Sequence, residues 1–109
     1  MTPTELHALT EPLAKAEPSL YPCGSDGSPY VGLDTIDPAA AEALWRDAMV
    51  RWLAQRTRLG VEVHPVTGDA ELFDCLPEVN EHLTSGPTLT HALAAAVRAV
   101  LVAQGKIHA

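Results

Sequence analysis

Positively charged side chains are scarce in this sequence. It has 7 Lys and Arg residues against 14 Asp and Glu residues, which gives a formal net charge of −7 over 109 residues. Affinity for nucleic acids comes mainly from Lys and Arg side chains that neutralise phosphates, and binding to anionic membrane surfaces depends on the same side chains. The composition therefore predicts no nucleic-acid partner and no membrane partner, and it leaves room for a basic protein partner.

Cysteine is almost as rare. Cys23 and Cys75 are far apart and form neither a CxxC pair nor a disulfide framework. The N-terminal residues lack the basic and apolar regions that are typical of a secretory signal peptide. We therefore expect a cytoplasmic protein in which both thiols are reduced.

Aromatic residues number only five (two Trp, two Tyr and one Phe), so the core must consist largely of Ala, Leu and Val. The stretch 89–103 is apolar except for Thr90, His91 and Arg98. A membrane-spanning helix needs about 20 apolar residues, and this stretch is shorter, so it indicates a buried helix. A helix that is apolar nearly all round is central in its own fold or buried in an oligomer. From the oligomer alternative we expect an interface on this helix, at Ala92, Ala95, Ala99, Val102 and Ala103.

Hydrophobic periodicity and helix caps predict a single α+β domain over residues 1–109. Helices are expected over about 3–16, 38–59 and 88–104, strands at 30–33, 61–66 and 70–76, and loops at 17–29 and 78–87. The first helix should be short and bent at Pro12, the second should have Gly60 as its C′ residue, and the loop at 17–29 should be flexible. Pro65 cannot donate to a β-ladder, which puts the strand at 61–66 on an edge or ends it near His64. The strands should form a small antiparallel or mixed sheet, including a hairpin, packed against the two long helices.

Side chains with chemical potential are present but are not spaced as known motifs. His64, Cys75, His82 and His91 are candidates for a metal site or, with Asp74, for nucleophilic catalysis. Neither HExxH nor CxxC spacing occurs, and nothing positions an oxyanion hole. If the strands at 61–66 and 70–76 pair, His64 is expected close to the turn between them, with Asp74 or Cys75 as a candidate neighbour. The sequence thus predicts no catalytic residue, no metal site and no cofactor, with these four side chains as the alternative.

Two segments carry a resemblance to a known family. The segment PYVGLDTIDPAAAEAL runs into an alanine-rich helix, and SGPTLTHALAAAVRAVL places a Gly and a Thr-Leu step before the last helix. Over about residues 30–102 the chain resembles the small phage- and prophage-encoded α–β–α sandwich domain proteins, the phage ABA sandwich group. The resemblance implies a sandwich of helices and a small sheet. It implies no activity and no catalytic residues.

These observations favour a non-enzymatic interaction or structural protein that acts as a homo-oligomer, with a dimer the simplest form, or as a subunit of a larger assembly. Three alternatives stay open. One is a small enzyme or metal-dependent binding protein that uses His64, Cys75, His82 and His91. Another is an acidic antitoxin-like or immunity-like inhibitor of a basic partner. The third is a protein that binds a small molecule between sheet and helix.

Overall fold

The computed structural model describes residues 1–108 and has an α+β fold. This part of the chain contains three α-helices, one short 3-10 helix and three strands. In chain order they are α1 (Pro3–Ala16), η1 (Pro18–Leu20), α2 (Pro38–Ala54), β1 (Leu59–Val63), β2 (Ala70–Cys75), β3 (Asn80–Gly86) and α3 (Leu89–Ala103). None of the helices within residues 1–108 is long and apolar enough to cross a membrane.

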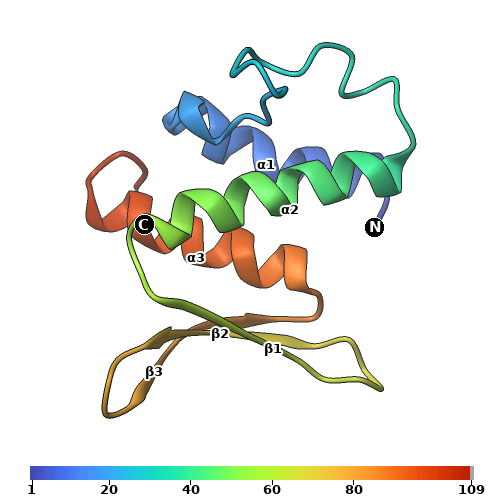
Figure 1. The fold of residues 1–109 in the computed structure, drawn as a ribbon. Coiled ribbons are helices and arrows are strands. Elements are labelled where there is room, and N and C mark those ends of the chain that lie inside the picture. Colours follow the sequence, from blue (N-terminus) through green and yellow to red (C-terminus); the bar gives the residue numbers. More distant parts are fainter. Residues whose placement is uncertain (109) are drawn as a thin grey trace.

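The last helix, α3, is the centre of the molecule. It lies between the sheet on one side and α1 and α2 on the other (Figure 1). This position accounts for its apolar surface, because both sides of the helix are covered by the rest of the chain. The expectation that both long helices pack against the sheet is not confirmed: α2 contacts mainly α3, and β1 is the strand that it meets most closely.

Each α-helix begins with a side-chain cap. At α1, Thr2 and Glu5 form a reciprocal capping box. At α2, the Asp37 carboxylate accepts the Ala39 N–H at 2.8 Å, and Pro38 occupies the first turn. At α3, the Thr88 hydroxyl accepts the His91 N–H at 3.2 Å. These caps satisfy amide groups that the helices themselves leave unpaired.

The core is built from aliphatic side chains and two tryptophans. Its fully buried members include Leu53 of α2, Leu72 of β2, and Leu93, Val97 and Leu101 of α3. Small residues allow close packing where the chain passes from β3 to α3. A Cβ atom at Gly86 would lie only 2.8 Å from the Ala92 nitrogen, so any other residue there would push β3 away from the first turn of α3.

The sheet is an antiparallel meander in the order β1-β2-β3. The hairpin predicted from the two strand patterns is confirmed, with Val61 paired to Leu72 and Val63 paired to Ala70. Strand β1 ends at Val63, two residues before Pro65, and lies at an edge of the sheet. The expectation that Pro65 puts this strand on an edge or ends it near His64 is therefore confirmed.

The third strand is not the predicted one. Residues 30–33 form no strand, and 31–33 lie in turns, with Gly32 at a φ of 78° and Val31 92% exposed. The partner of β2 is instead β3, which was predicted to be a loop. Polar residues in 80–86 hide the strand pattern, and pairing with β2, which includes a register shift between Leu72 and Phe73, decides the conformation.

The second helix also ends earlier than predicted. It stops at Ala54, not at Leu59. The Thr57 N–H and hydroxyl both donate to the Leu53 carbonyl oxygen, which closes the helix at this point. Gly60 is therefore not a helix C′ residue but a residue of β1, where a Cβ atom would lie 2.5 Å from Cys75 Sγ.

A polar contact joins α2 to the start of α3 inside this largely apolar structure. The hydroxyl of Thr90, which is fully buried, donates to Glu42 Oε2 at 2.6 Å. The Glu42 carboxylate also accepts from Arg46, at 3.4 Å. Its negative charge lies beside the N-terminus of α3, where the helix dipole favours an anion. Glu42 thus fixes the relative position of the two helices.

We predict that Thr90→Val lowers the free energy of unfolding by about 1–3 kcal/mol, because it leaves a partly buried carboxylate without one of its donors. Urea denaturation measures the change. Thr90→Ser, which keeps the hydroxyl, is the matched control and should lose much less. A Thr90→Val protein as stable as the wild type would show that the contact does not join the helices.

Candidate functional site

Of the four side chains proposed for chemistry, Cys75 and His82 lie on the paired strands β2 and β3, whereas His64 and His91 lie elsewhere. His64 follows β1, and its Nδ1 accepts the N–H groups of Val66 and Thr67 at 3.3 Å each. His91 is in the first turn of α3, with Nδ1 at 2.7 Å from the Thr88 hydroxyl. His82 of β3 packs edge-on against Phe73, with the ring centroids 5.6 Å apart. Each of these three histidines therefore has a local structural partner.

The expected proximity of His64 to Asp74 or Cys75 is wrong. The strand register puts His64 opposite Asp69, at the turn between β1 and β2, whereas Cys75 lies at the opposite end of β2 and pairs with Arg58. Asp74 is also occupied, since its carboxylate accepts the Arg58 N–H at 3.1 Å. The hairpin therefore keeps the thiol and the imidazole apart.

No group of three or more His, Cys, Asp or Glu side chains within residues 1–108 is placed to hold a metal ion. Cys23 is exposed, Cys75 is half-buried, and both are free thiols. The hairpin register also keeps His64 away from Cys75, so these two candidate side chains are not brought together.

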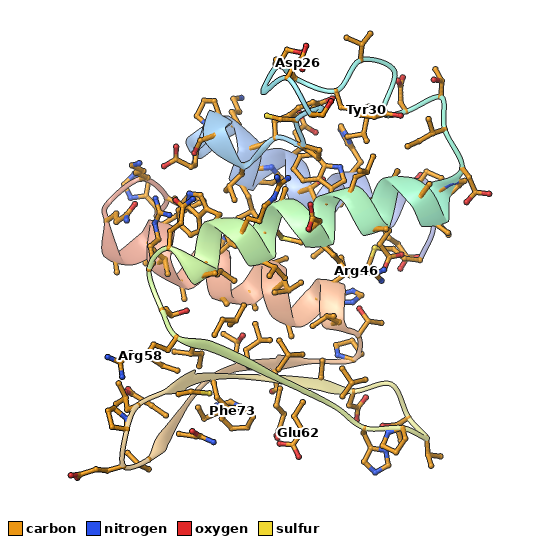
Figure 2. The ribbon with its side chains drawn as sticks, viewed as in Figure 1. Asp26, Tyr30, Arg46, Arg58, Glu62 and Phe73 are labelled. Atoms are coloured by element: carbon orange, nitrogen blue, oxygen red, sulfur yellow. The ribbon has the colours of Figure 1, made fainter. Side chains whose placement is uncertain are left out.

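One face of the sheet is not covered by a helix. Glu62 and Phe73 point away from the helices on this outer face (Figure 2). Glu62 lies directly opposite Glu71, an arrangement of like charges that is unfavourable across a strand pair. An open antiparallel sheet face is common in soluble domains and does not by itself identify a site.

A groove of about 580 Å³ lies at the hairpin end of the sheet. Its lining comes from the strands and their connections, at residues 62–65, 69–71 and 85–87. Three of these residues, Glu62, Asp69 and Glu71, carry carboxylates. The groove is therefore acidic, and it does not lie between sheet and helix, where a small-molecule site was expected.

The pKa of two carboxyl groups is lowered by neighbouring groups. A hydrogen bond from the Lys106 ammonium group, at 2.6 Å, and a second one from Ser19 lower the pKa of Glu17. Hydrogen bonds from the Ser28 hydroxyl and N–H lower the pKa of Asp26. Both contacts hold turns and termini in place, and neither involves a candidate catalytic residue.

The predicted interface on α3 is divided by the fold. Ala92 is completely buried, so it belongs to the core and is wrong as an interface residue. Ala95, Ala99 and Ala103 remain exposed and Val102 is half-buried. The apolar character of α3 is thus explained mainly by its central position, and the exposed alanines are what remains of the predicted interface.

A different apolar surface was not singled out from the sequence. Val61 and Val63 of β1 are 45% and 47% exposed. They lie on the same side of the sheet as their buried cross-strand neighbours, Leu72 and Ala70. The signals that locate this surface are the alternating valines and Pro65, which together predicted an edge strand.

Comparisons with models of protein families, with curated proteins and with solved structures found no match to this chain. The resemblance to the phage ABA sandwich group therefore stays a prediction.

We predict that substitution by arginine has a large effect on stability at one position of α3 and almost none at another. Ala92→Arg should lower the free energy of unfolding by more than about 4 kcal/mol, because a charged side chain has no room in the core. Ala99→Arg should change it by no more than about 0.5 kcal/mol, because that position is exposed. Thermal denaturation followed by circular dichroism compares the two. Equal destabilisation would mean that Ala99 is also covered by the fold.

Proposed function

We propose that this chain is a non-enzymatic interaction or structural protein that acts as a homo-oligomer or as a subunit of a larger assembly. The observation that supports this most is the uncovered surface of β1. Val61 and Val63 are side by side on one face of the strand and are each about half exposed. A cluster of exposed apolar side chains next to the core is a common mark of a contact surface.

The sheet explains why these valines stay uncovered. Strands β2 and β3 are covered by α3, which contacts both of them. Strand β1 lies outside this cover at the edge, and α2, the nearest other helix, ends at Ala54 before the strand begins. Within residues 1–108 no further element buries the valines, and we propose that a second protein chain covers them.

A basic partner is the second candidate, and the acidic groove favours it. Glu62, Asp69 and Glu71 line one hollow in a chain whose net charge is −7. Such a surface attracts Lys and Arg side chains of another protein, as an antitoxin-like or immunity-like inhibitor would. Either function is compatible with the cytoplasmic location predicted from the two cysteines.

The dependence of assembly on salt distinguishes these candidates. Two copies of an acidic chain repel each other, so added salt should screen the repulsion and strengthen self-association. Binding of a basic partner should become weaker under the same change. We predict a dimer or higher oligomer in light scattering behind a sizing column, with a dissociation constant that falls as salt is raised.

Native mass spectrometry of the same peak is the control for bound metals or small molecules. A monomer that carries a stoichiometric metal or ligand would contradict the interaction function. In that case the histidines and Cys75 would again be the first residues to examine.

A further inference from the structure

The open edge of β1, meaning the backbone groups that face away from β2, is the feature with the clearest binding capacity. In the ladder with β2, the His64 N–H donates to the Asp69 carbonyl and the Cys75 N–H donates to the Arg58 carbonyl, each at 2.8 Å. Hydrogen-bonded residues alternate along an antiparallel strand. Gly60 and Glu62 therefore face β2, and the backbone groups of 59, 61 and 63 face outward.

Nothing within residues 1–108 blocks these outward groups. No backbone hydrogen bond to another element is made by residue 59, 61 or 63. The strand contains neither Lys nor Pro, the residues that usually protect an edge from pairing. The opposite edge strand, β3, also lacks Lys and Pro, but its pairing with β2 contains a register shift, which makes that edge irregular. The two edges of the sheet are thus unequal, and β1 is the regular one.

We infer that β1 pairs with β1 of a second copy, antiparallel across a two-fold axis at Val61, so that two three-stranded sheets become one continuous sheet. This inference rests on the proposed function and specifies its partner. Val61 then lies opposite Val61 of the second copy, and Leu59 lies opposite Val63. Each of these pairs exchanges two backbone hydrogen bonds, because all the residues involved have their backbone groups on the open edge.

Side chains on the helix side of the sheet fit this register. Val61 and Val63 are on the same face as the buried residues Leu72 and Ala70. Pairing brings Val61 against its own copy and Val63 against Leu59, so the apolar row continues from one copy into the other. The half-exposed valines become the centre of an interface, where apolar burial stabilises association.

Charge on the outer face selects the same register. Glu62 lies opposite Gly60 of the second copy, a residue without a side chain. If the two-fold axis moved by one residue toward the β1–β2 turn, Glu62 would lie opposite Glu62 of the second copy, which is unfavourable for like charges. If the axis moved by one residue the other way, to Gly60, the ladder between the copies would need the Thr57 N–H. This N–H already donates to the Leu53 carbonyl. The two-fold axis at Val61 is therefore the arrangement without a conflict.

The first test compares two lysine substitutions with the same change of charge. Val61→Lys places two ammonium groups opposite each other at the axis, so we expect it to weaken dimerisation by more than about tenfold. Val66→Lys is the control, because Val66 is 86% exposed and lies in the turn beyond β1. It should dimerise at least as tightly as the wild type. Sedimentation velocity over a range of concentrations measures both.

The second test reads the register by crosslinking. In a chain with Cys23→Ser and Cys75→Ser, a short bismaleimide should crosslink Val61→Cys between the two copies, because hydrogen-bonded partners have Cα atoms about 5.5 Å apart. Val63→Cys should not be crosslinked, because the two copies of residue 63 are separated by about 13 Å along the strands. Crosslinking at 63 but not at 61 would overturn the register.

The outcomes separate this inference from the proposed function. A dimer that survives Val61→Lys but is split by Ala99→Arg would overturn β1 pairing and leave the homo-oligomer in place, with α3 as its interface. A wild-type chain that stays monomeric at all concentrations would overturn both β1 pairing and the homo-oligomer. Loss of folding by Val61→Lys is detected by circular dichroism, and crosslinking then decides the case.

Discussion

Burial of α3 on both sides is the constraint on which the rest of this structure depends. One side needs a sheet and the other needs helices, so α3 requires β2 and β3 below it and α1 and α2 above it (Figure 1). Within residues 1–108 the chain covers α3 on both sides but leaves the edge strand partly open. Val61 and Val63 are therefore left half exposed. The stability of the core and the open surface that we propose as an interface have one common cause.

Local signals in the sequence predicted most of the fold. The caps at Thr2 and Asp37 predict the starts of α1 and α2, and the hairpin follows from two alternating segments around a turn. The errors occur where tertiary pairing overrides local preference. Residues 80–86 become a strand because β2 needs a partner, although their polar composition predicts a loop. Residues 30–33 have a strand composition but no neighbouring strand, so they form turns.

The candidate sites were harder to predict, because they depend on register and on depth in the core. The predicted hairpin suggested Asp74 or Cys75 as a neighbour of His64, yet the observed register separates them. The apolar surface of α3 suggested an interface, but Ala92 is buried by the chain's own sheet. Pro65 did predict the edge position of β1. The exposed fraction of Val61 and the direction of its backbone groups could come only from the arrangement of the strands.

Hydrogen exchange of the β1 amides tests the central claim most directly, since it observes the open edge residue by residue. The amide of Glu62 faces β2 and should be protected at every protein concentration, which makes it the internal control. The amides of Val61 and Val63 should exchange rapidly in dilute protein and become protected as concentration rises and a second copy pairs with the edge. Rapid exchange at both valines under conditions where the protein is fully assembled would contradict the account.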